Sequence, residues 1–285
     1  MSRIAYVNGR YLPRAHACVD IEDRGFQFAD GVYEVCQVQD GLLVDEARHL
    51  ARLQRSLSEL QIRMPMPENA LRIVLRETIA RNRVRNGIVY LQVTRGSARR
   101  DFPFPDAAVP PTFVVTARSA NPEAVEQLAE RGIAVVTVPD IRWGRVDIKS
   151  VGLLPNVLAK QAARDRGARE AWLIDGAGEI TEGASSNAWI VARDGTLITR
   201  KVDHHILRGV TRTTLLDAIS ALGLTLAERG FTVEEAYAAR EAFVTSASQT
   251  VMPVVKIDGQ PVGTGSPGPL TRALRRDFHR FAQST

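Results

Sequence analysis

A single lysine, Lys149, lies in a short segment that connects a predicted strand to a predicted helix. Residues 133–138 before it are rich in β-branched side chains, and residues 157–167 after it have a helical pattern. Apolar neighbours at Ile148, Val151, Leu153 and Leu154 predict that the lysine is partly shielded from water. Loss of hydration favours the neutral amine, which is a nucleophile and a base. The alternative is a lysine whose stem packs while its ammonium group reaches water.

A second polar segment, 180–187, follows about thirty residues later, between apolar runs at 171–174 and 188–191. It reads Ile-Thr-Glu-Gly-Ala-Ser-Ser-Asn and offers a carboxylate, a glycine, two hydroxyls and an amide. We expect it to form the short path between two strands. Alone, a Thr-Glu-Gly sequence indicates no more than a turn with an exposed glutamate.

The Asp-Ile-Lys-Ser sequence at 147–150 and the Thr-Glu-Gly-Ala-Ser-Ser-Asn sequence at 181–187 together resemble the class IV pyridoxal-phosphate aminotransferases, in particular the bacterial D-amino acid aminotransferases. The resemblance runs from the Tyr-Val-Asn-Gly sequence at 6–9 to the predicted C-terminal helix. It implies an α+β protein of fold type IV, with two α/β lobes and the cofactor site between them, working as a homodimer.

The resemblance assigns the central chemistry to two residues. Lys149 matches the family's Schiff-base lysine, and its amine, once displaced by substrate, can carry a proton during the reaction. Glu182 matches the acid that faces the pyridine nitrogen and keeps the ring protonated.

Three segments resemble the family's phosphate site. Leu207 to Arg212 opens a predicted helix, so the amides of Val210 and Thr211 and the Thr211 hydroxyl would face an anion, with Leu207 against the cofactor ring. Read without the resemblance, Thr211 is a helix cap and Leu207 a core residue.

The second and third segments contain Ser246, Ala247 and Arg52. Ser246 and Ala247 follow a predicted strand, and Ala247 stands where related enzymes have a threonine, so that only its amide remains for the phosphate. Arg52 matches the family's phosphate-binding arginine. Helical spacing places Arg52 opposite a stripe of leucines. Read without the resemblance, it is a residue of a solvated face, whereas the resemblance implies that this face lines the cofactor pocket.

Substrate recognition is expected from Tyr33 and from the long loop 95–111, which is rich in proline and arginine. Tyr33 matches a tyrosine that faces the active site. Arg100 takes the place of an arginine that binds the substrate α-carboxylate from the neighbouring subunit, and its planar fork suits a carboxylate. Phe102 replaces the histidine that helps it, which makes the pocket more apolar, and Arg99 could compensate. Without the resemblance, Arg99 and Arg100 are a solvated loop pair.

Alternating apolar patterns and turn signals predict a mixed chain with a composition shift near residue 120. We expect a small N-terminal α/β domain at 1–120 and a larger domain at 121–285 that carries the lysine. Two hairpins are expected at the Asn8-Gly9 and Asp40-Gly41 turns. Further elements are expected as follows: helices at 46–60, 69–85, 210–222 and the C-terminus; strands at 88–93, 112–116 and 242–245; a hairpin at Asp258-Gly259.

Net charge and cysteine content restrict the classes of binding partner and the cellular compartment that we expect. The formal net charge is +5 and the arginines are scattered, so a phosphorylated cofactor and acidic substrates suit the chain better than nucleic acid. Cys18 and Cys36 have no disulfide or metal spacing, which points to a reducing compartment, and no histidine lies in a metal-ligand pattern. No apolar run spans a bilayer and the N-terminus lacks a signal sequence, so we expect a cytoplasmic protein without a metal.

The sequence therefore predicts a pyridoxal-phosphate-dependent aminotransferase that moves an amino group from a D-alanine-like D-amino acid to a 2-oxoglutarate-like acid by a ping-pong mechanism. Phe102 favours an (R)-selective amine transaminase as an alternative. A 4-amino-4-deoxychorismate lyase shares the same machinery, and a branched-chain L-aminotransferase is a further alternative. From another class, a basic binding module with a vestigial site remains open.

Overall fold

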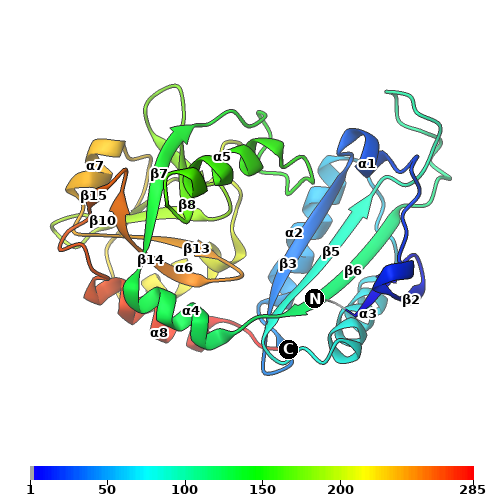
Figure 1. The fold of residues 1–285 in the computed structure, drawn as a ribbon, viewed down its shortest axis with the longest axis horizontal. Helices are drawn as coiled ribbons and strands as arrows, with labels where there is room; N and C mark the ends of the chain where they lie inside the picture. The colour runs from blue at the N-terminus through cyan, green and yellow to red at the C-terminus, as the bar shows by residue number, and fades with distance from the viewer. Residues whose placement is uncertain (1–2) are drawn as a thin grey trace. The chain divides into compact units, whose positions relative to one another are not determined.

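The computed structural model describes residues 3–285, which form two compact units (Figure 1). The first unit contains the chain up to Pro122 together with Ile148–Gly152 and Ser284–Thr285, and the second contains Glu123–Asp147 and Leu153–Gln283. Two segments of the expected second domain fall in the first unit: the last two residues, and the segment with Lys149, which pairs with a strand there. As a domain boundary, residue 120 stays a prediction.

The first unit is built on a six-stranded antiparallel sheet with the strand order β2-β1-β6-β5-β3-β4 (Figure 1). Its strands are β1 Ile4–Val7, β2 Arg10–Pro13, β3 Gly31–Gln39, β4 Leu42–Leu43, β5 Gly87–Thr94 and β6 Thr112–Ser119. Its helices are the 3-10 helix Arg14–His16, α1 Arg24–Phe28, α2 Glu46–Glu59 and α3 Glu68–Arg81.

Alternation along the strands gives this sheet one buried and one half-buried face. The buried face packs against α2 and α3, whose leucine stripes enter one continuous core. Ile148, next to Lys149, belongs to that core. The other face carries Tyr33, Tyr90 and Gln92, each half-buried.

The Asn8-Gly9 hairpin is confirmed, because both residues have positive φ (44° and 93°), as a type I′ turn requires. Helix α3 ends earlier than expected, at Arg81 rather than Arg85. The Asn82 side chain explains this, since it donates to the carbonyls of Thr78 and Ile4 and ties the end of the helix to β1. Gly87 begins β5 instead of ending the helix.

The second unit is built on a nine-stranded mixed sheet with the order β12-β11-β10-β13-β14-β7-β8-β9, with β15 paired to β14. Its strands are β7 Ile133–Pro139, β8 Glu170–Ile174, β9 Ile180–Gly183, β10 Asn187–Val191, β11 Leu197–Thr199, β12 Leu226–Glu228, β13 Glu241–Ser246, β14 Thr250–Ile257 and β15 Gln260–Pro261. Its helices are α4 Pro122–Arg131, α5 Leu154–Asp165, α6 Val210–Ala221, α7 Val233–Ala238 and α8 Pro269–Phe281. Separate apolar clusters fill the spaces under α5 and under α6 and α8.

Two local expectations for this unit need correction. Residues 180–183 form the strand β9, paired with β8, so Glu182 lies within a strand and not on a path between strands. Helix α5 begins at Leu154, three residues earlier than expected, and the Leu154 side chain is 69% exposed, so it does not shield Lys149 from water.

Candidate active site

Lys149 is held at the open edge of β3. Strand β4 pairs only with the far end of β3, at Val38 and Gln39, which leaves the edge near its first residues free. The segment Ile148–Gly152 takes this edge: the Tyr33 amide donates to the Lys149 carbonyl (3.0 Å), and the Val151 amide donates to the Gly31 carbonyl (3.0 Å). The lysine backbone therefore extends the sheet of the first unit.

Two further bonds fix the lysine backbone. The Ser150 amide donates to the Ile148 carbonyl at 2.7 Å, which closes a three-residue turn centred on Lys149. The Lys149 amide donates to the hydroxyl of Ser56, a residue of α2 that is 1% exposed (3.3 Å). The half-buried side chain places Nζ 4.1 Å from the centre of the Tyr33 ring. The structure thus brings together Lys149 and Tyr33 as expected, with a fixed main chain under the amine.

Arg52 is paired and its side chain is only 10% exposed, unlike the solvated residue that helical spacing alone predicts. Its Nε and Nη2 donate to the two carboxylate oxygens of Glu34 at 2.7 and 2.8 Å. Glu34 lies on β3 and is fully buried, and His49 Nδ1 lies 2.7 Å from the same carboxylate. Burial alone would raise the pKa of Glu34, but the charge and hydrogen bonds of Arg52, with those of His49, hold that pKa well below its usual range.

Sequence reasoning missed Glu34, His49 and Ser56. His49, Arg52 and Ser56 follow one another at spacings of three and four on α2, so they share one face of the helix. The sequence does contain a signal for them. It consists of this polar stripe on α2 and of Glu34, the one charged residue of the strand β3. Burial lowers the pKa of His49, and the Glu34 carboxylate opposes that effect only in part.

Tyr33 is part of a small polar and aromatic group on the half-buried face of the first sheet. Its ring stacks on Tyr90, with centroids 5.6 Å apart, and the Tyr90 hydroxyl donates to Gln92 Oε1 at 2.6 Å. Burial raises the pKa of Tyr90 to about 12, so its hydroxyl stays protonated and keeps donating at neutral pH. This pair orients the Tyr33 ring beside Lys149.

Glu182 is surrounded by hydrogen-bond donors in the second unit. Its carboxylate accepts from Arg142 Nη1, from Asn187 Nδ2 at 2.9 Å and from the Leu207 amide at 3.2 Å. Its side chain is 6% exposed. Arg142 also forms a two-point pair with Asp140, and these two carboxylates raise the Arg142 pKa against the opposing effect of burial. Glu182 is therefore held in one orientation, as a carboxylate facing a ring nitrogen must be.

The serine hydroxyls beside Glu182 bind a different carboxylate. Ser185 and Ser186 both donate to Oε2 of Glu170, at 2.6 and 3.1 Å. The turn after β9 is thereby fixed to β8, and these hydroxyls serve the turn.

The start of α6 presents uncapped amides. Gly209 is its N-cap and supplies no side-chain acceptor, and a Cβ there would collide with Asn187 Oδ1. The hydroxyls of Thr213 and Thr214 donate back to carbonyls of the preceding turn, whereas within residues 3–285 the Thr211 hydroxyl makes no such bond. The amides of Val210 and Thr211, with this hydroxyl, therefore suit an anion.

Asn187 connects Leu207 to Glu182 and pairs with Thr245, the residue before Ser246. The Asn187 amide group donates to the Leu207 carbonyl as well as to Glu182, both at 2.9 Å. Asn187 pairs with Thr245 across β10 and β13, so Ser246 follows at the end of β13 and Ala247 begins the turn after it. Ser246 and Ala247 are half-buried and Ser248 is exposed.

Each unit by itself holds groups that suit pyridoxal phosphate. The first has an amine and an arginine, and the second has an oriented carboxylate and an uncapped helix start that suits a phosphate. The class IV amino-transferase family matches residues 31–257, which is more than half of the chain. The chain belongs to the class IV aminotransferases.

Relatives and solved structures agree with this family. The chain is 42% identical to a D-alanine aminotransferase of Bacillus licheniformis over 94% of this chain and 93% of the relative. It is 41% identical to a D-alanine aminotransferase of Staphylococcus haemolyticus over 98% of both chains. The fold is similar to that of the branched-chain amino acid aminotransferase of Escherichia coli, with a TM-score of 0.90 and 23% identity, covering 98% of this chain and 94% of that one.

These matches confirm the expected fold type IV, cofactor and class of reaction: the protein is a pyridoxal-phosphate-dependent aminotransferase. The roles of the individual site residues stay predictions.

In this aminotransferase, the loop after β5 is anchored to its own unit. Arg95 is buried, binds Asp30 with Nε and Nη2 (2.7 and 3.0 Å), and stacks on Phe104. Arg100 is exposed, with its guanidinium 5.0 Å from the centre of the Phe28 ring. Phe102 is 79% exposed and packs against the same ring. The loop therefore presents Arg100 and Phe102 outward on a fixed base.

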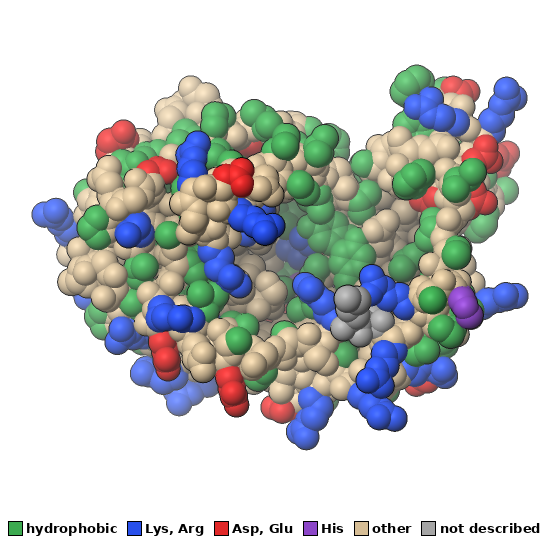
Figure 2. Space-filling model, viewed as in Figure 1, with side chains coloured by type: hydrophobic (Ala, Val, Ile, Leu, Met, Phe, Trp, Pro, Cys, Tyr) green, Lys and Arg blue, Asp and Glu red, His purple; other side chains and the backbone are tan. Residues whose placement is uncertain are grey.

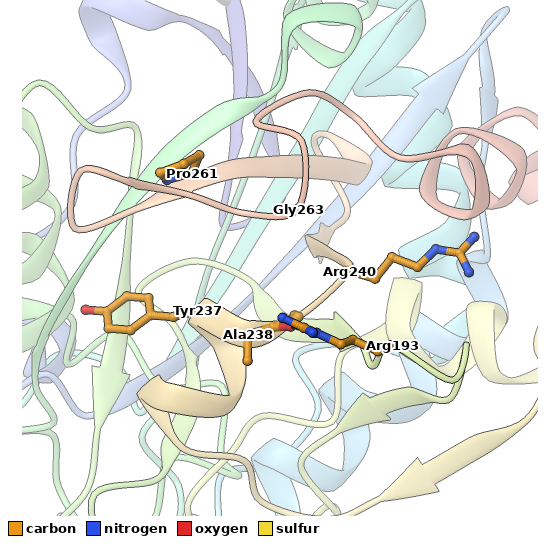
Figure 3. A pocket seen from close by; sticks show the side chains of 7 residues that line it. Arg193, Tyr237, Ala238, Arg240, Pro261 and Gly263 are labelled. Carbon is orange, nitrogen blue, oxygen red and sulfur yellow. The ribbon is translucent and has the colours of Figure 1, made fainter.

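A cavity of about 340 Å³ lies elsewhere in the second unit, lined by Arg193, residues 237–240, Pro261 and Gly263 (Figure 3). None of the predicted site residues lines it. The guanidinium groups of Arg193 and Arg240 point in different directions, and the Tyr237 hydroxyl points away from them (Figure 3). The Tyr237 hydroxyl donates to Asp258 at 3.0 Å. The cavity therefore lacks the convergent donors of an anion site.

Other kinds of site find little support in the described part of the chain. Lysine and arginine side chains form several separate groups on the face shown in Figure 2, interspersed with apolar and polar ones. Across residues 3–285, no cluster of three or more histidine, cysteine or acidic side chains could hold a metal ion. No helix within that range has the length and apolarity needed to cross a membrane.

Proposed function

We propose that this aminotransferase moves an amino group from a D-amino acid such as D-alanine to a 2-oxo acid such as 2-oxoglutarate by a ping-pong mechanism. The observation that carries the proposal is the arrangement of Lys149, whose main chain is fixed at several points while its amine lies over the Tyr33 ring. The two D-alanine aminotransferases of about 40% identity support the choice of D-amino acids.

Bound pyridoxal phosphate supplies an electron-withdrawing ring that stabilises negative charge at the substrate Cα. In this proposal, Lys149 would hold the cofactor through Nζ until the substrate amine displaces it, and the freed Lys149 amine would then move the proton at Cα. Its fixed backbone and the Tyr33 ring restrict the path of Nζ, which favours transfer on one face. Glu182, oriented by Arg142 and Asn187, holds a proton at the ring nitrogen.

The phosphate is assigned to Val210, Thr211, Ser246, Ala247 and Arg52. Helix α6 contributes uncapped amides, and the turn after β13 contributes amides and the Ser246 hydroxyl. Arg52 contributes charge, with its guanidinium plane set by Glu34. Leu207 is assigned to the face of the cofactor ring, since its main chain is bound on both sides to the Glu182–Asn187 pair.

The substrate α-carboxylate is assigned to Arg100, with Tyr33 lining the site and Phe102 making it more apolar. We propose a homodimer in which Arg100 serves the neighbouring subunit. We also place the enzyme in the cytoplasm, because both cysteines are free.

Stereochemistry and chemistry are tested by mixing the loaded enzyme with D-alanine, L-alanine or (R)-1-phenylethylamine and following the visible absorption of the bound cofactor. D-Alanine should react fastest. Equal or faster reaction with L-alanine would overturn the D-amino acid assignment, and faster reaction with the amine would favour the amine transaminase that Phe102 suggests. Borohydride reduction followed by peptide mapping should label Lys149, and a label on another lysine would overturn the assigned chemistry.

A mixed-dimer experiment tests the role of Arg100 across subunits. Lys149→Ala and Arg100→Ala chains are each weak alone, but a mixed dimer has one site with an intact lysine and the partner's intact arginine. Random reassembly should restore about a quarter of the wild-type rate with D-alanine. No recovery in a mixture shown to contain mixed dimers would mean that Arg100 does not serve the neighbouring site.

A further inference from the structure

A single carboxylate at the start of β3 binds two buried arginines. Asp30 accepts from Arg24 Nε at 2.8 Å and from Arg95 at 2.7 and 3.0 Å. Arg24 is 4% exposed and Arg95 9%. Charges so buried are costly unless they are paired, and here Asp30 pairs with both.

Arg24 extends from this pair to the loop that carries Arg100. Its Nη1 donates to the Asp101 carbonyl at 2.6 Å, and its Nη2 lies 3.3 Å from the Phe102 carbonyl. These are the two residues that follow Arg100 in the chain. One planar guanidinium thus joins Asp30 to the backbone directly beside Arg100, a geometry that a lysine cannot reproduce.

The Phe28 ring completes the contact between α1 and the loop. The Arg24 guanidinium carbon lies 4.8 Å from its centre, and that of Arg100 lies 5.0 Å from it. The Phe102 ring packs against the same ring with centroids 5.7 Å apart. Both the backbone around Arg100 and its guanidinium therefore rest on residues 24–30.

A loop of this length needs a structural anchor if it is to hold a substrate in one position. Residues 97–111 contain no helix or strand, and Arg99 and Arg100 are exposed. A flexible Arg100 would have to be ordered each time a carboxylate binds, which weakens binding. Fixing the loop in advance removes most of that cost.

We propose that Arg24 is a positioning residue that sets Arg100 for the substrate carboxylate, with Asp30 fixing Arg24 and Phe28 supporting both guanidinium groups. The proposal rests on the proposed function, in which Arg100 binds that carboxylate. It assigns substrate affinity to a buried arginine that need not touch the substrate.

The first test is Arg24→Lys, which keeps the positive charge but removes the planar guanidinium group that reaches both Asp30 and the loop. Loss of charge-assisted hydrogen bonds to the loop should raise KM for D-alanine by about tenfold or more, with a much smaller change in kcat. Hydrogen exchange in cofactor-free protein should become faster in peptides covering residues 97–104 and stay unchanged in β5. Arg10→Lys, an exposed arginine of the same unit, is the matched control and should change neither quantity.

The exchange measurement separates this proposal from the proposed function, because it needs neither cofactor nor substrate. Unchanged loop exchange in Arg24→Lys would show that Arg24 does not anchor the loop. Faster exchange with an unchanged KM for D-alanine would show that the anchor does not serve carboxylate binding. If D-alanine is not a substrate of the wild type, both the proposed function and the positioning role of Arg24 fail. Hydrogen exchange would then still show whether Arg24 anchors the loop.

Phe28→Leu provides a second variant if Arg24→Lys does not fold. It removes the ring under both guanidinium groups and should raise KM for D-alanine by about two- to fivefold. Phe26→Leu, on the exposed side of the same short helix, is its control. An equal effect of Phe26→Leu and Phe28→Leu would overturn the part assigned to Phe28.

Discussion

Glu34 and Arg52 form a two-point ion pair, with Nε 2.7 Å from Oε1 and Nη2 2.8 Å from Oε2, and the Glu34 side chain is fully buried. Such a pair fixes the plane of the guanidinium as well as its position. The residue proposed to bind the cofactor phosphate is thereby oriented by the fold of the first unit.

Glu34→Gln should destabilise the protein strongly at neutral pH, because it leaves Arg52 buried without its charge partner. We expect a loss of about 3–5 kcal/mol in the free energy of unfolding. Urea unfolding of the cofactor-free protein at pH 7 measures it. Glu77→Gln removes an exposed pair with Arg81 on α3 and should cost less than about 1 kcal/mol.

The same pair should make the free energy of unfolding of the wild type depend on pH in the acidic range. The pKa of Glu34 is lowered by folding, so its contribution is complete above the unfolded value of about 4.3 and is lost as pH falls through the lower folded value. The stability difference between wild type and Glu34→Gln should therefore shrink below about pH 4. A constant difference down to pH 3 would contradict the assigned cause.

Ser56→Ala should loosen the main chain of Lys149, since the Ser56 hydroxyl is the acceptor for the Lys149 amide. The expected loss is about 1 kcal/mol of stability, with faster exchange of the Lys149 amide in cofactor-free protein. Ser58→Ala, an exposed serine of the same helix, is the control. Identical exchange in the two variants would show that the 3.3 Å contact does not protect this amide.

Sequence patterns located most elements because their apolar periodicity is strong. The α2 stripe of Leu50, Leu53 and Leu57 is an example, and all three are buried. The buried polar residues were harder to foresee. Glu34 reads as an exposed strand residue until its partners on α2 are known, and those partners are defined only by the way the helix packs on the sheet.

The same limit applies to the lysine segment. Motif resemblance singles out Lys149 as a candidate, but the pairing of its segment with β3 is a contact between positions more than a hundred residues apart. No local pattern states that β4 leaves the first residues of β3 unpaired, so that the lysine segment can take that edge. Leu154 shows that an apolar side chain need not be buried. Its place near the lysine predicts that it shields the amine from water, but the side chain is exposed.

Arg142→Lys should disturb Glu182 without removing positive charge. The arginine fork binds Asp140 at two points and reaches Glu182 with its remaining nitrogen, which a lysine cannot do. We expect lower stability by about 1.5–3 kcal/mol and a lower kcat with little change in KM. Arg193→Lys, exposed in the same unit, should behave like the wild type, and a raised KM with normal kcat in Arg142→Lys would contradict this role.

Ala247→Thr should strengthen cofactor binding if the turn after β13 holds the phosphate. The residue is half-buried at the end of that strand, and a hydroxyl there would add a hydrogen bond to a charged group. Such bonds contribute about 1.5–3 kcal/mol, so the Kd for pyridoxal phosphate should fall by about tenfold or more. Ala247→Val has nearly the same shape as the threonine variant without the hydroxyl and should not lower the Kd. Titration of cofactor-free protein measures both, and equal Kd values for the two variants would show that the phosphate is out of reach of a side chain at position 247.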